Sequence, residues 1–295
     1  MERFGTVAIV GVGLIGGSIG QALRAKGLAR RVVGIGRDNV RLDEAQKLGA
    51  IDLGTIDQAQ GVSDADIVVV CTPVDRIAGD ILNAAISSPD DAMISDAGST
   101  KRAIVAAVEV DPTARAKFVA AHPIAGSERS GVAYARADLF AGKVCVLTPT
   151  DRTPAPQLDR AREFWSALGC RLIELDPATH DKRLARTSHL PHALAAALAS
   201  LVGPELAPLA AGAYRDVTRV AGADASLWTP IFLENRQAVL DALDAYNAAL
   251  TGFRAALEAG DETRLSAWWN LARSNRLAFD AQNHQGDVAS GAVRE

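Results

Sequence analysis

The sequence predicts an α/β domain followed by an all-helical domain, and two observations carry this prediction. From Thr6 to Leu175, short apolar runs of strand length alternate with helix-compatible segments, the pattern of a sheet with crossover helices. After Leu175 the strand signals stop, and Ala- and Leu-rich helices run to about Asp280. We therefore expect one domain at residues 1–176, a second at 177–280, and a disordered Gly-, Ser- and Ala-rich tail at 281–295.

The stretch TVAIVGVGLIGGS, Thr6–Ser18, is the clearest local signal. A buried parallel strand is expected to end in a turn and then a helix, and Gly11, Gly13 and Gly16 fit the pattern G-x-G-x-x-G in that setting. Gly11 allows a tight turn, Gly13 lets the backbone approach a pyrophosphate, and Gly16 lets the helix pack on the strand. The first domain is thus expected to be a Rossmann-type dinucleotide-binding domain.

The end of the second expected strand, Arg31–Ile35, bears on the choice of cofactor. NAD sites carry an acid there to hold the ribose 2′-hydroxyl, whereas this chain has Gly36 followed by Arg37. A guanidinium can pair with a 2′-phosphate, so NADP is favoured, with Arg41 as a second candidate partner. NAD stays open because a one-residue shift would bring Asp38 to this position. The alternative is that both arginines are simply solvated.

Composition excludes several functional classes. The formal net charge of -4 gives no basic surface for nucleic acid, and no apolar run reaches the ~20 residues of a membrane span. The first strand begins too early to leave room for a signal peptide. The three scattered cysteines have no metal-ligand spacing and fit reduced thiols in the cytoplasm. They are Cys71, Cys145 and Cys170.

Polar residues follow several of the later strands, at the edge where open α/β sheets bind ligands. The strand Ala92–Ser95 leads to Ser99, and the strand Phe118–Ala121 leads directly to His122. A hydrogen bond between Ser99 and His122 would fix the imidazole tautomer, although Ser99 could equally be a helix N-cap. The other expected strands are Ala65–Cys71, which precedes Thr72 and Pro73, and Val144–Thr148 and Arg171–Leu175, which complete the same sheet.

The helical domain carries further candidates. His189 and His192 lie three apart, but no third ligand accompanies them, so no metal site is predicted and polar contacts to a substrate are favoured. Arg219 and Trp228 lie further along. An arginine among so many apolar helical residues suggests a carboxylate anchor, although Arg215 could instead pair with a neighbouring acid.

Taken together, these motifs resemble the prephenate and arogenate dehydrogenase family of tyrosine biosynthesis. The resemblance spans nearly the whole chain, through VAIVGVGLIGGS, DAGSTK, HPIAGSERSG, HDKRLARTSHLPH, RDVTR and LWTPIFLENR. It implies that His122 is the catalytic histidine and Ser99 its hydrogen-bond partner. It further implies that Glu128 gates substrate entry, that His192 contacts the substrate, that Arg219 binds the ring carboxylate and that Trp228 is an active-site aromatic. The chain departs from NAD-using relatives at Gly36 and Arg37.

The resemblance implies oxidative decarboxylation of prephenate or arogenate, with hydride transfer to NADP or NAD, in a cytoplasmic homodimer. The alternatives are a β-hydroxyacid dehydrogenase or imine reductase of similar architecture, or a non-catalytic NADP-sensing regulator. The expected cofactor contacts are Gly11, Gly13, Leu14, Ile15, Gly16, Arg37, Thr72 and Pro73. The expected substrate contacts are Ser127, Glu128, Ser188, His192, Arg219 and Trp228.

Overall fold

The computed structural model of the chain describes residues 3–126 and 129–291. The chain forms two compact units, Met1–Val239 and Leu240–Glu295. This division differs from the predicted boundary near residue 176, because the first helices of the helical region pack on the α/β part. Helix α8 (Pro177–Leu184) packs on α5 (Arg102–Val108), and α11 (Ala225–Glu234) packs on α4 (Val74–Ser87).

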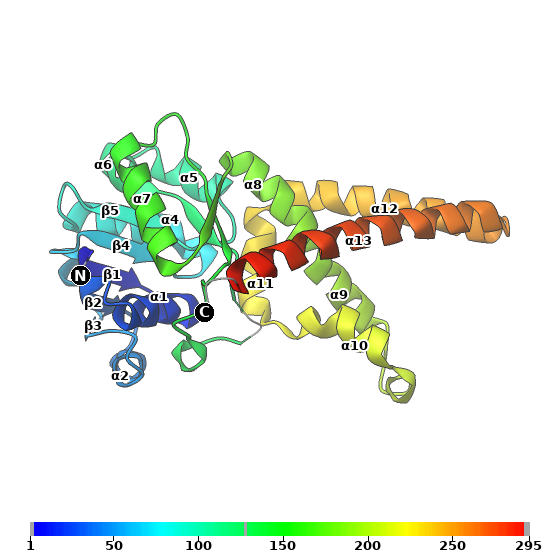
Figure 1. Cartoon of the computed structure of the whole chain (residues 1–295), viewed down its shortest axis with the longest axis horizontal. Helices are drawn as coiled ribbons and strands as arrows, with labels where there is room; N and C mark the ends of the chain where they lie inside the picture. The colour runs from blue at the N-terminus through cyan, green and yellow to red at the C-terminus, as the bar shows by residue number, and fades with distance from the viewer. Residues whose placement is uncertain (1–2, 127–128, 292–295) are drawn as a thin grey trace. The chain divides into compact units, whose positions relative to one another are not determined.

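A six-stranded parallel sheet forms the centre of the first unit, in the order β3-β2-β1-β4-β5-β6 (Figure 1). The order reverses between β1 and β4, which creates the crevice where doubly wound sheets bind ligands. The predicted α/β fold is therefore confirmed. The strands are β1 Phe4–Val10, β2 Ala29–Ile35, β3 Leu53–Thr55, β4 Ile67–Val70, β5 Met93–Asp96 and β6 Phe118–Val119.

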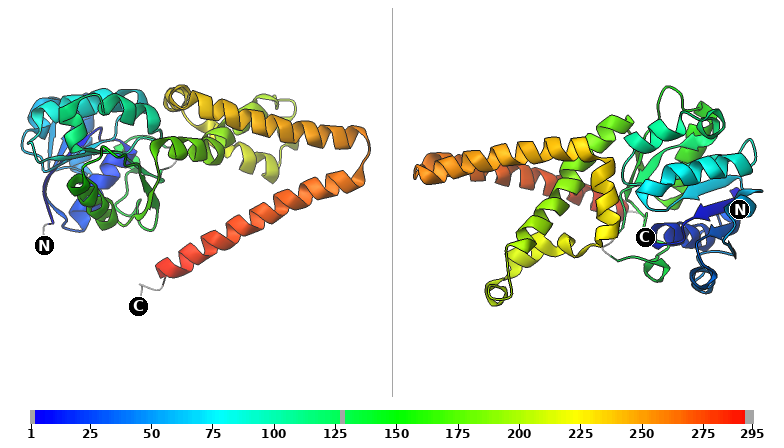
Figure 2. Two further views of the ribbon diagram at one scale, coloured as in Figure 1. Left: turned by 90° about the horizontal axis from the view of Figure 1, so that it is seen from above. Right: turned by 180° about the vertical axis from the view of Figure 1, so that it is seen from behind.

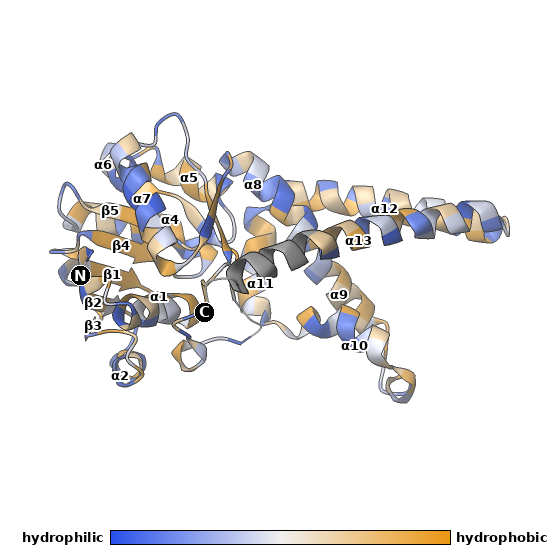
Figure 3. Ribbon diagram, in the orientation of Figure 1, coloured by the Kyte–Doolittle hydropathy of each residue, from blue (hydrophilic) through white to orange (hydrophobic). Residues whose placement is uncertain are grey.

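Helices cover both faces of this sheet, and alternate residues of each strand enter opposite cores. Val7 and Ile9 pack in the core beneath α1 and α7, whereas Ala8 and Val10 pack in the core beneath α4 and α5. Strands buried on both faces read as continuous apolar runs, as the hydrophobic colour of β1 and β4 in Figure 3 shows. The remaining helices of this part are α1 Leu14–Ala25, α2 Asn39–Lys47, α3 Gln58–Val62, α6 Pro112–Lys117 and α7 Ala155–Leu168.

A second sheet corrects one sequence prediction. The apolar run that begins at Phe118 splits at Ala120, and the chain enters a three-stranded sheet of order β7-β8-β9. The split occurs because the N–H of Ala121 donates to the side chain of Asp96 (3.0 Å) instead of pairing within the first sheet. His122 consequently lies inside a strand rather than after one. The strands are β7 Ala121–Pro123, β8 Val144–Leu147 and β9 Arg171–Glu174.

The first unit ends in a series of helices after Asp176, whose carboxylate accepts the N–H of Thr179 (2.9 Å) and so caps α8. A π-helical turn, Ala185–His189, follows α8 directly. Pro191 is the second residue of α9, in the first turn, where its missing N–H is tolerated. The further elements are α9 Leu190–Ser200, α10 Gly212–Thr218 and short 3-10 turns at Val132–Tyr134, Ala207–Leu209 and Arg219–Gly222.

The second unit consists of two long helices, α12 (Arg236–Glu258, which begins in the first unit) and α13 (Glu262–Gly291), joined by a tight turn (Figure 2). Phe253 and Trp268 pack across this turn with ring centroids 4.8 Å apart. Helix α13 extends to Gly291, into the stretch 281–295 where the sequence predicted a disordered tail; residues 292–295 lie outside the described part. Among the described helices, none combines the length and apolarity needed to cross a bilayer.

Candidate active site

The glycine-rich turn has the geometry expected for a dinucleotide. Gly11 has φ +95°, and a Cβ there would lie 2.9 Å from the backbone of Cys71. A Cβ on Gly16 would lie 2.2 Å from the carbonyl oxygen of Gly11, so helix and strand can pack this closely only without a side chain. A Cβ on Gly13, the N-cap of α1, would meet no protein atom within 4 Å. The space beside Gly13 therefore fits a pyrophosphate at a helix N-terminus.

The residues after β2 lie where the adenosine ribose of a dinucleotide would be. Strand β2 ends at Ile35, so Gly36 is the first residue beyond it, as the sequence predicted. Asp38 is the N-cap of α2: its carboxylate accepts the N–H of Arg41 (2.9 Å) and lies 3.5 Å from the Arg41 guanidinium. The side chain of Arg37 is exposed. The acid at this position therefore already serves the helix, and an arginine beside it faces solvent.

The other predicted cofactor contacts lie near the same edge of the sheet. Leu14 and Ile15 begin α1 and are partly buried against the apolar core. Thr72 follows β4, and its hydroxyl donates to the carboxylate of Asp80 (2.6 Å). Pro73 is the N-cap of α4. The turn after β1 and the turn after β4 thus both border the crevice between these strands.

His122 is held in place by a buried ion pair. The carboxylate of Asp96 at the end of β5 pairs with the Lys101 ammonium, and both side chains are fully buried. The same carboxylate accepts the N–H groups of Gly98 (2.9 Å) and Ala121 (3.0 Å). Because Ala121 precedes His122 in the chain, Asp96 fixes the backbone that presents the histidine.

The structure gives His122 a partner that the sequence did not predict. Nδ1 of His122 lies 2.9 Å from Nε2 of His180, and Nδ1 of His180 lies 2.8 Å from Oδ1 of Asp181. Ser99 lies in the loop between β5 and α5, partly exposed, and no hydrogen bond joins it to His122 in the described part of the chain. A role for Ser99 remains a prediction. His180 is part of the sequence HDK, His180 to Lys182, which is visible in the sequence. Nothing in its spacing indicates that His180 contacts His122, which lies 58 positions earlier.

A second group of aromatic and polar side chains lies next to His122, His180 and Asp181. The His192 ring stacks on Trp228 with centroids 3.7 Å apart, and His189 meets the same indole edge-on at 6.0 Å. Asn235 donates to the carbonyl of Asp181 (2.8 Å) and lies 3.1 Å from Nδ1 of His189. The π-helical turn that presents His189 is a kind of distortion that recurs at functional sites.

The remaining predicted substrate contacts are placed as follows. Ser188 lies in the π-helical turn, and its carbonyl oxygen is 2.9 Å from Nδ1 of His192. Arg219 begins a 3-10 turn that packs on α9, and its charge helps to lower the pKa of His192. The structure therefore brings His192, Trp228 and Arg219 into one region. Ser127 and Glu128 lie outside the described residues.

The electrostatics of the cluster favour neutral imidazoles. Burial lowers the pKa of His122 well below its ordinary value, and the neighbouring His180, Lys101 and His189 lower it further. Burial likewise lowers the pKa of His180 against the opposing effect of Asp181. The pKa of His189 falls to about 4, again chiefly because of burial. A neutral histidine can accept a proton, so His122 is suited to act as a base near pH 7.

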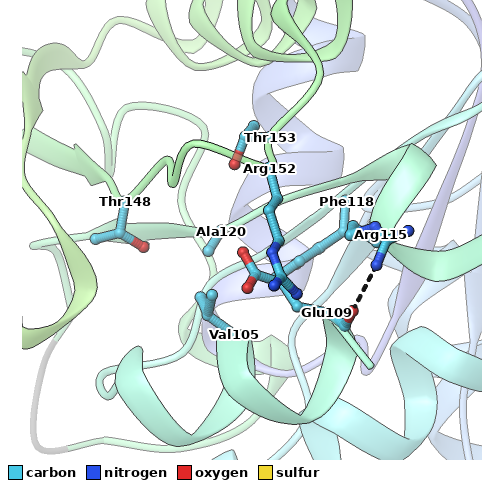
Figure 4. A pocket seen from close by; sticks show the side chains of 8 residues that line it. All are labelled: Val105, Glu109, Arg115, Phe118, Ala120, Thr148, Arg152 and Thr153. Carbon is cyan, nitrogen blue, oxygen red and sulfur yellow. Dashed lines mark hydrogen bonds between the residues drawn. The ribbon is translucent and has the colours of Figure 1, made fainter. Parts of the chain in front are cut away.

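A separate pocket lies beside α5 and the segment after β8 (Figure 4). Its polar groups are partly engaged with one another, since Arg115 donates to the Glu109 carbonyl (3.1 Å). None of the predicted site residues lines it, so the candidate site is the histidine cluster. The pocket is lined by Val105, Glu109, Arg115, Phe118, Ala120, Thr148, Arg152 and Thr153.

A glycine-rich turn at the switch point of a parallel sheet, with neutral histidines in the same unit, is typical of dinucleotide-dependent oxidoreductases. Residues 19–174 match the family model described as the nucleotide-binding domain of prephenate dehydrogenase, and residues 176–271 match its dimerization domain. The chain belongs to the prephenate dehydrogenase family. The two matches meet close to Asp176, where the sequence predicted the boundary between domains.

Individual relatives agree with this assignment. The chain is 32% identical to prephenate dehydrogenase of Bacillus subtilis, over 92% of this chain and 75% of the relative. It is 34% identical to cyclohexadienyl dehydrogenase of Zymomonas mobilis, over 95% of this chain and 97% of the relative. The structure of prephenate dehydrogenase from A. aeolicus, in complex with hydroxyphenyl propionate and NAD+, superimposes with a TM-score of 0.88 at 31% identity, covering 95% and 98% of the two chains. These matches favour this family over the hydroxyacid dehydrogenase and imine reductase alternatives.

Proposed function

We propose that this chain oxidises and decarboxylates prephenate or arogenate, giving 4-hydroxyphenylpyruvate from the first and tyrosine from the second. The observation that carries the proposal is the position of His122, held by Asp96 and His180 in a chain of this family, where burial lowers the pKa of the imidazole. The relatives support both substrates, because one solved structure is an arogenate dehydrogenase from Synechocystis at 27% identity with a TM-score of 0.78. The two substrates differ only in a keto or amino group on the side chain.

The chemistry assigns a task to each group. The dinucleotide that the turn at Gly11, Gly13 and Gly16 would hold would supply the hydride acceptor for the carbinol carbon of the substrate ring. His122 takes the proton of the carbinol hydroxyl, and a carbonyl group forms at that carbon. The bond to the ring carboxylate then breaks and CO2 leaves. Its bonding electrons complete the aromatic ring, and the former carbonyl oxygen, now a phenolate, takes a proton back from His122. Aromatisation drives the reaction forward, so the protein has mainly to position the substrate.

We assign the positioning to the region of His192, Trp228 and Arg219. The guanidinium of Arg219 offers charged donors for the ring carboxylate, and the stacked rings of His192 and Trp228 form an apolar wall. Ser127, Glu128 and Ser188 complete the proposed substrate contacts, and Ser99 is kept as a proposed catalytic residue.

We further propose that NADP is the preferred cofactor. Gly36 offers no carboxylate to repel a 2′-phosphate, and Asp38 is occupied at the N-terminus of α2, whereas exposed Arg37 can pair with the phosphate. The A. aeolicus relative holds NAD+ in its solved structure, so NAD is the alternative.

A homodimer is the proposed assembly. The family model that matches residues 176–271 is described as a dimerization domain. Helix α13 exposes large apolar side chains, with Trp269 and Leu271 each 66% exposed, and such side chains are commonly covered in an assembly. Light scattering coupled to gel filtration should give twice the chain mass of 30.9 kDa.

The decisive experiment measures turnover of both substrates with both cofactors at equal concentrations. We expect oxidation of at least one substrate, with NADP giving the higher kcat/KM. His122→Asn should lower kcat by ~10²-fold or more while cofactor affinity is retained. Absence of turnover with all four combinations would refute the proposed function, and a variant with normal turnover would move the base to another residue, with His192 the first to test.

A further inference from the structure

The row His122, His180 and Asp181 joins two parts of the chain that the sequence keeps far apart. Asp181 accepts three hydrogen bonds: Oδ1 from the N–H of Lys101 (2.9 Å) and from His180, and Oδ2 from the N–H of Arg102 (2.9 Å). His180 is fully buried, and its ring meets that of His122 edge-on, with centroids 5.1 Å apart. Both ring nitrogens of His180 are therefore engaged with protein groups.

These contacts determine which nitrogen carries each hydrogen. The Asp181 carboxylate is anchored by two backbone donors and acts only as an acceptor, so Nδ1 of His180 must carry a hydrogen. Burial keeps the His180 ring neutral, and its Nε2 is then an unprotonated acceptor. An acceptor 2.9 Å from Nδ1 of His122 requires a hydrogen on that nitrogen in turn. In a neutral His122 ring, Nε2 is then left without a hydrogen.

We propose that His180 is a positioning residue that holds His122 as its Nδ1–H tautomer, so that the unprotonated Nε2 is the atom that takes the substrate proton. This inference rests on the proposed function for the identity of the proton donor. The tautomer itself follows from these contacts together with the burial of the His180 ring.

Charged and titratable groups surround His122 on several elements. Lys101 approaches from the loop before α5, His180 from α8 and His189 from the π-helical turn, and each lowers the pKa of His122. The Lys101 charge is balanced by its ion pair with Asp96. Neutral His122 is therefore the ground state, and the tautomer decides whether that neutral ring can act as a base at the substrate.

His189 provides an internal contrast. Asn235 must present its amide nitrogen to the carbonyl oxygen of Asp181, because only the nitrogen can donate there. The same amide nitrogen lies 3.1 Å from Nδ1 of His189, so Nδ1 of His189 is the acceptor. The hydrogen of the neutral His189 ring then lies on Nε2. The two buried histidines His180 and His189 are thus fixed in opposite tautomers by neighbouring protein groups.

During the proton transfer, the hydrogens on Nδ1 of His122 and Nδ1 of His180 stay in place. When Nε2 of His122 accepts the substrate proton, the ring becomes a cation that still donates through Nδ1 to His180. His180 continues to donate to the Asp181 carboxylate, whose negative charge stabilises the new positive charge through one intervening ring. After CO2 has left, the ring oxygen is a phenolate, and the proton on Nε2 of His122 returns to that oxygen to give the phenol of the product.

Nitrogen-15 NMR of the full-length protein labelled only at histidine tests the tautomer directly. The two-bond couplings from ring protons distinguish a protonated from an unprotonated nitrogen. At pH 7.5 we expect His122 and His180 to show protonated Nδ1 and His189 to show protonated Nε2, with His122→Asn used to assign the first signal. A His122 signal with protonated Nε2 would overturn the proposal, whether or not the enzyme turns over.

Two variants test the consequence for the reaction. His180→Gln can present a carbonyl oxygen to His122 and an amide N–H to Asp181, so kcat should stay within ~10-fold of wild type. His180→Leu offers no acceptor, and kcat should fall by ~10²-fold with the KM values for substrate and cofactor within ~3-fold. If kcat falls equally in both variants, and the fall follows the decrease in their melting temperatures, His180 has a structural role and the proposal is contradicted. The wild-type spectrum remains decisive if His180→Leu does not fold.

The two proposals fail in different ways. Turnover of prephenate or arogenate together with an Nε2-protonated His122 would leave the function standing and remove the role of His180. The predicted tautomers without turnover of either substrate would refute the function instead, and with it the identity of the proton donor.

Discussion

The carboxylate of Asp181 caps the N-terminus of helix α5, although Asp181 lies 80 positions after Lys101 in the chain. Its Oδ1 accepts the N–H of Lys101 at 2.9 Å. Helix α5 has no side-chain cap from its own N-cap residue. Asp181 therefore completes a helix of the α/β part and, through His180, supports the candidate base. One carboxylate contributes to both stability and reactivity.

Asp181→Ala should consequently lower both the unfolding free energy and kcat. The variant leaves two backbone N–H groups and the His180 ring without an acceptor in a buried site, which should cost at least about 2 kcal/mol of unfolding free energy. We also expect kcat to fall by ~10²-fold. Urea unfolding and steady-state kinetics measure the two effects.

Asp111→Ala is the matched control. Asp111 caps α6 by accepting the N–H of Ala114 (2.7 Å) and contacts none of the site histidines. Its loss should cost about 1 kcal/mol and leave kcat within twofold of wild type. If Asp181→Ala loses stability but keeps its turnover, the carboxylate is a helix cap and nothing more.

The cofactor prediction concerns Gly36 and Arg37. Arg37→Ala should weaken NADP binding by roughly ten- to a hundredfold and leave NAD binding unchanged, because a charged hydrogen bond contributes about 1.5 to 3 kcal/mol. Gly36→Asp should reverse the preference toward NAD. A Cβ at Gly36 would lie 3.0 Å from Leu42, so this side chain must shift slightly. Fluorescence titration with each cofactor gives the affinities.

Arg30→Ala serves as the control, since this exposed arginine lies at the opposite end of β2. It should bind both cofactors as the wild type does. A wild-type enzyme that prefers NAD by tenfold or more would show that Asp38, despite capping α2, also holds the ribose.

Sequence patterns predicted those parts of the fold that are encoded locally. The roles of Gly11, Gly13 and Gly16 depend on a strand, a turn and a helix within a few residues, and the backbone clearances at Gly11 and Gly16 agree with them. The end of β2 was predicted for the same reason.

Long-range contacts explain what the sequence could not predict. The run Phe118–Ala121 reads as one strand, but the Asp96 carboxylate takes the Ala121 N–H and the chain leaves the first sheet. A short apolar run looks the same in either sheet, so β8 and β9 were assigned to the wrong one. His180 lies 58 positions from His122, and only the docking of α8 on α5 brings the two rings together.

The pH dependence of stability provides a third prediction. The pKa of His189 is lowered from 6.5 to about 4 in the folded chain. The unfolded chain therefore binds a proton at a higher pH, so the stability from this group is complete above pH 6.5 and is lost as the pH falls toward 4. His122 and His180 act in the same direction. The unfolding free energy should fall steadily across this window.

His189→Asn keeps an acceptor for Asn235 but cannot titrate there. Its unfolding free energy should depend less on pH, with up to about 3 kcal/mol of the acid-induced loss removed. Urea denaturation at pH 4.5, 5.5, 6.5 and 7.5 measures the difference. His192→Asn should have a smaller effect, because this ring is only partly buried. Parallel curves for wild type and His189→Asn would contradict the prediction.

The final prediction separates two explanations of Arg219. A structural role predicts that its loss lowers the melting temperature and affects every kinetic step. A role in binding the ring carboxylate predicts that the fold survives and substrate binding weakens. A charged hydrogen bond of about 1.5 to 3 kcal/mol corresponds to roughly ten- to a hundredfold in affinity. Arg219→Ala should therefore raise the substrate KM by at least ~10-fold, with a near-normal melting temperature and unchanged NADP affinity.

Arg215→Ala is the comparison, because Arg215 lies four residues earlier, on helix α10, and is likewise exposed. Its KM should stay within ~2-fold of wild type if Arg219 is the carboxylate anchor. A substrate analogue without the ring carboxylate sharpens the test, since Arg219→Ala and wild type should then bind it equally. An Arg219→Ala variant that melts far below wild type yet keeps its KM would refute the assignment, and a raised KM in Arg215→Ala would move the anchor to that residue.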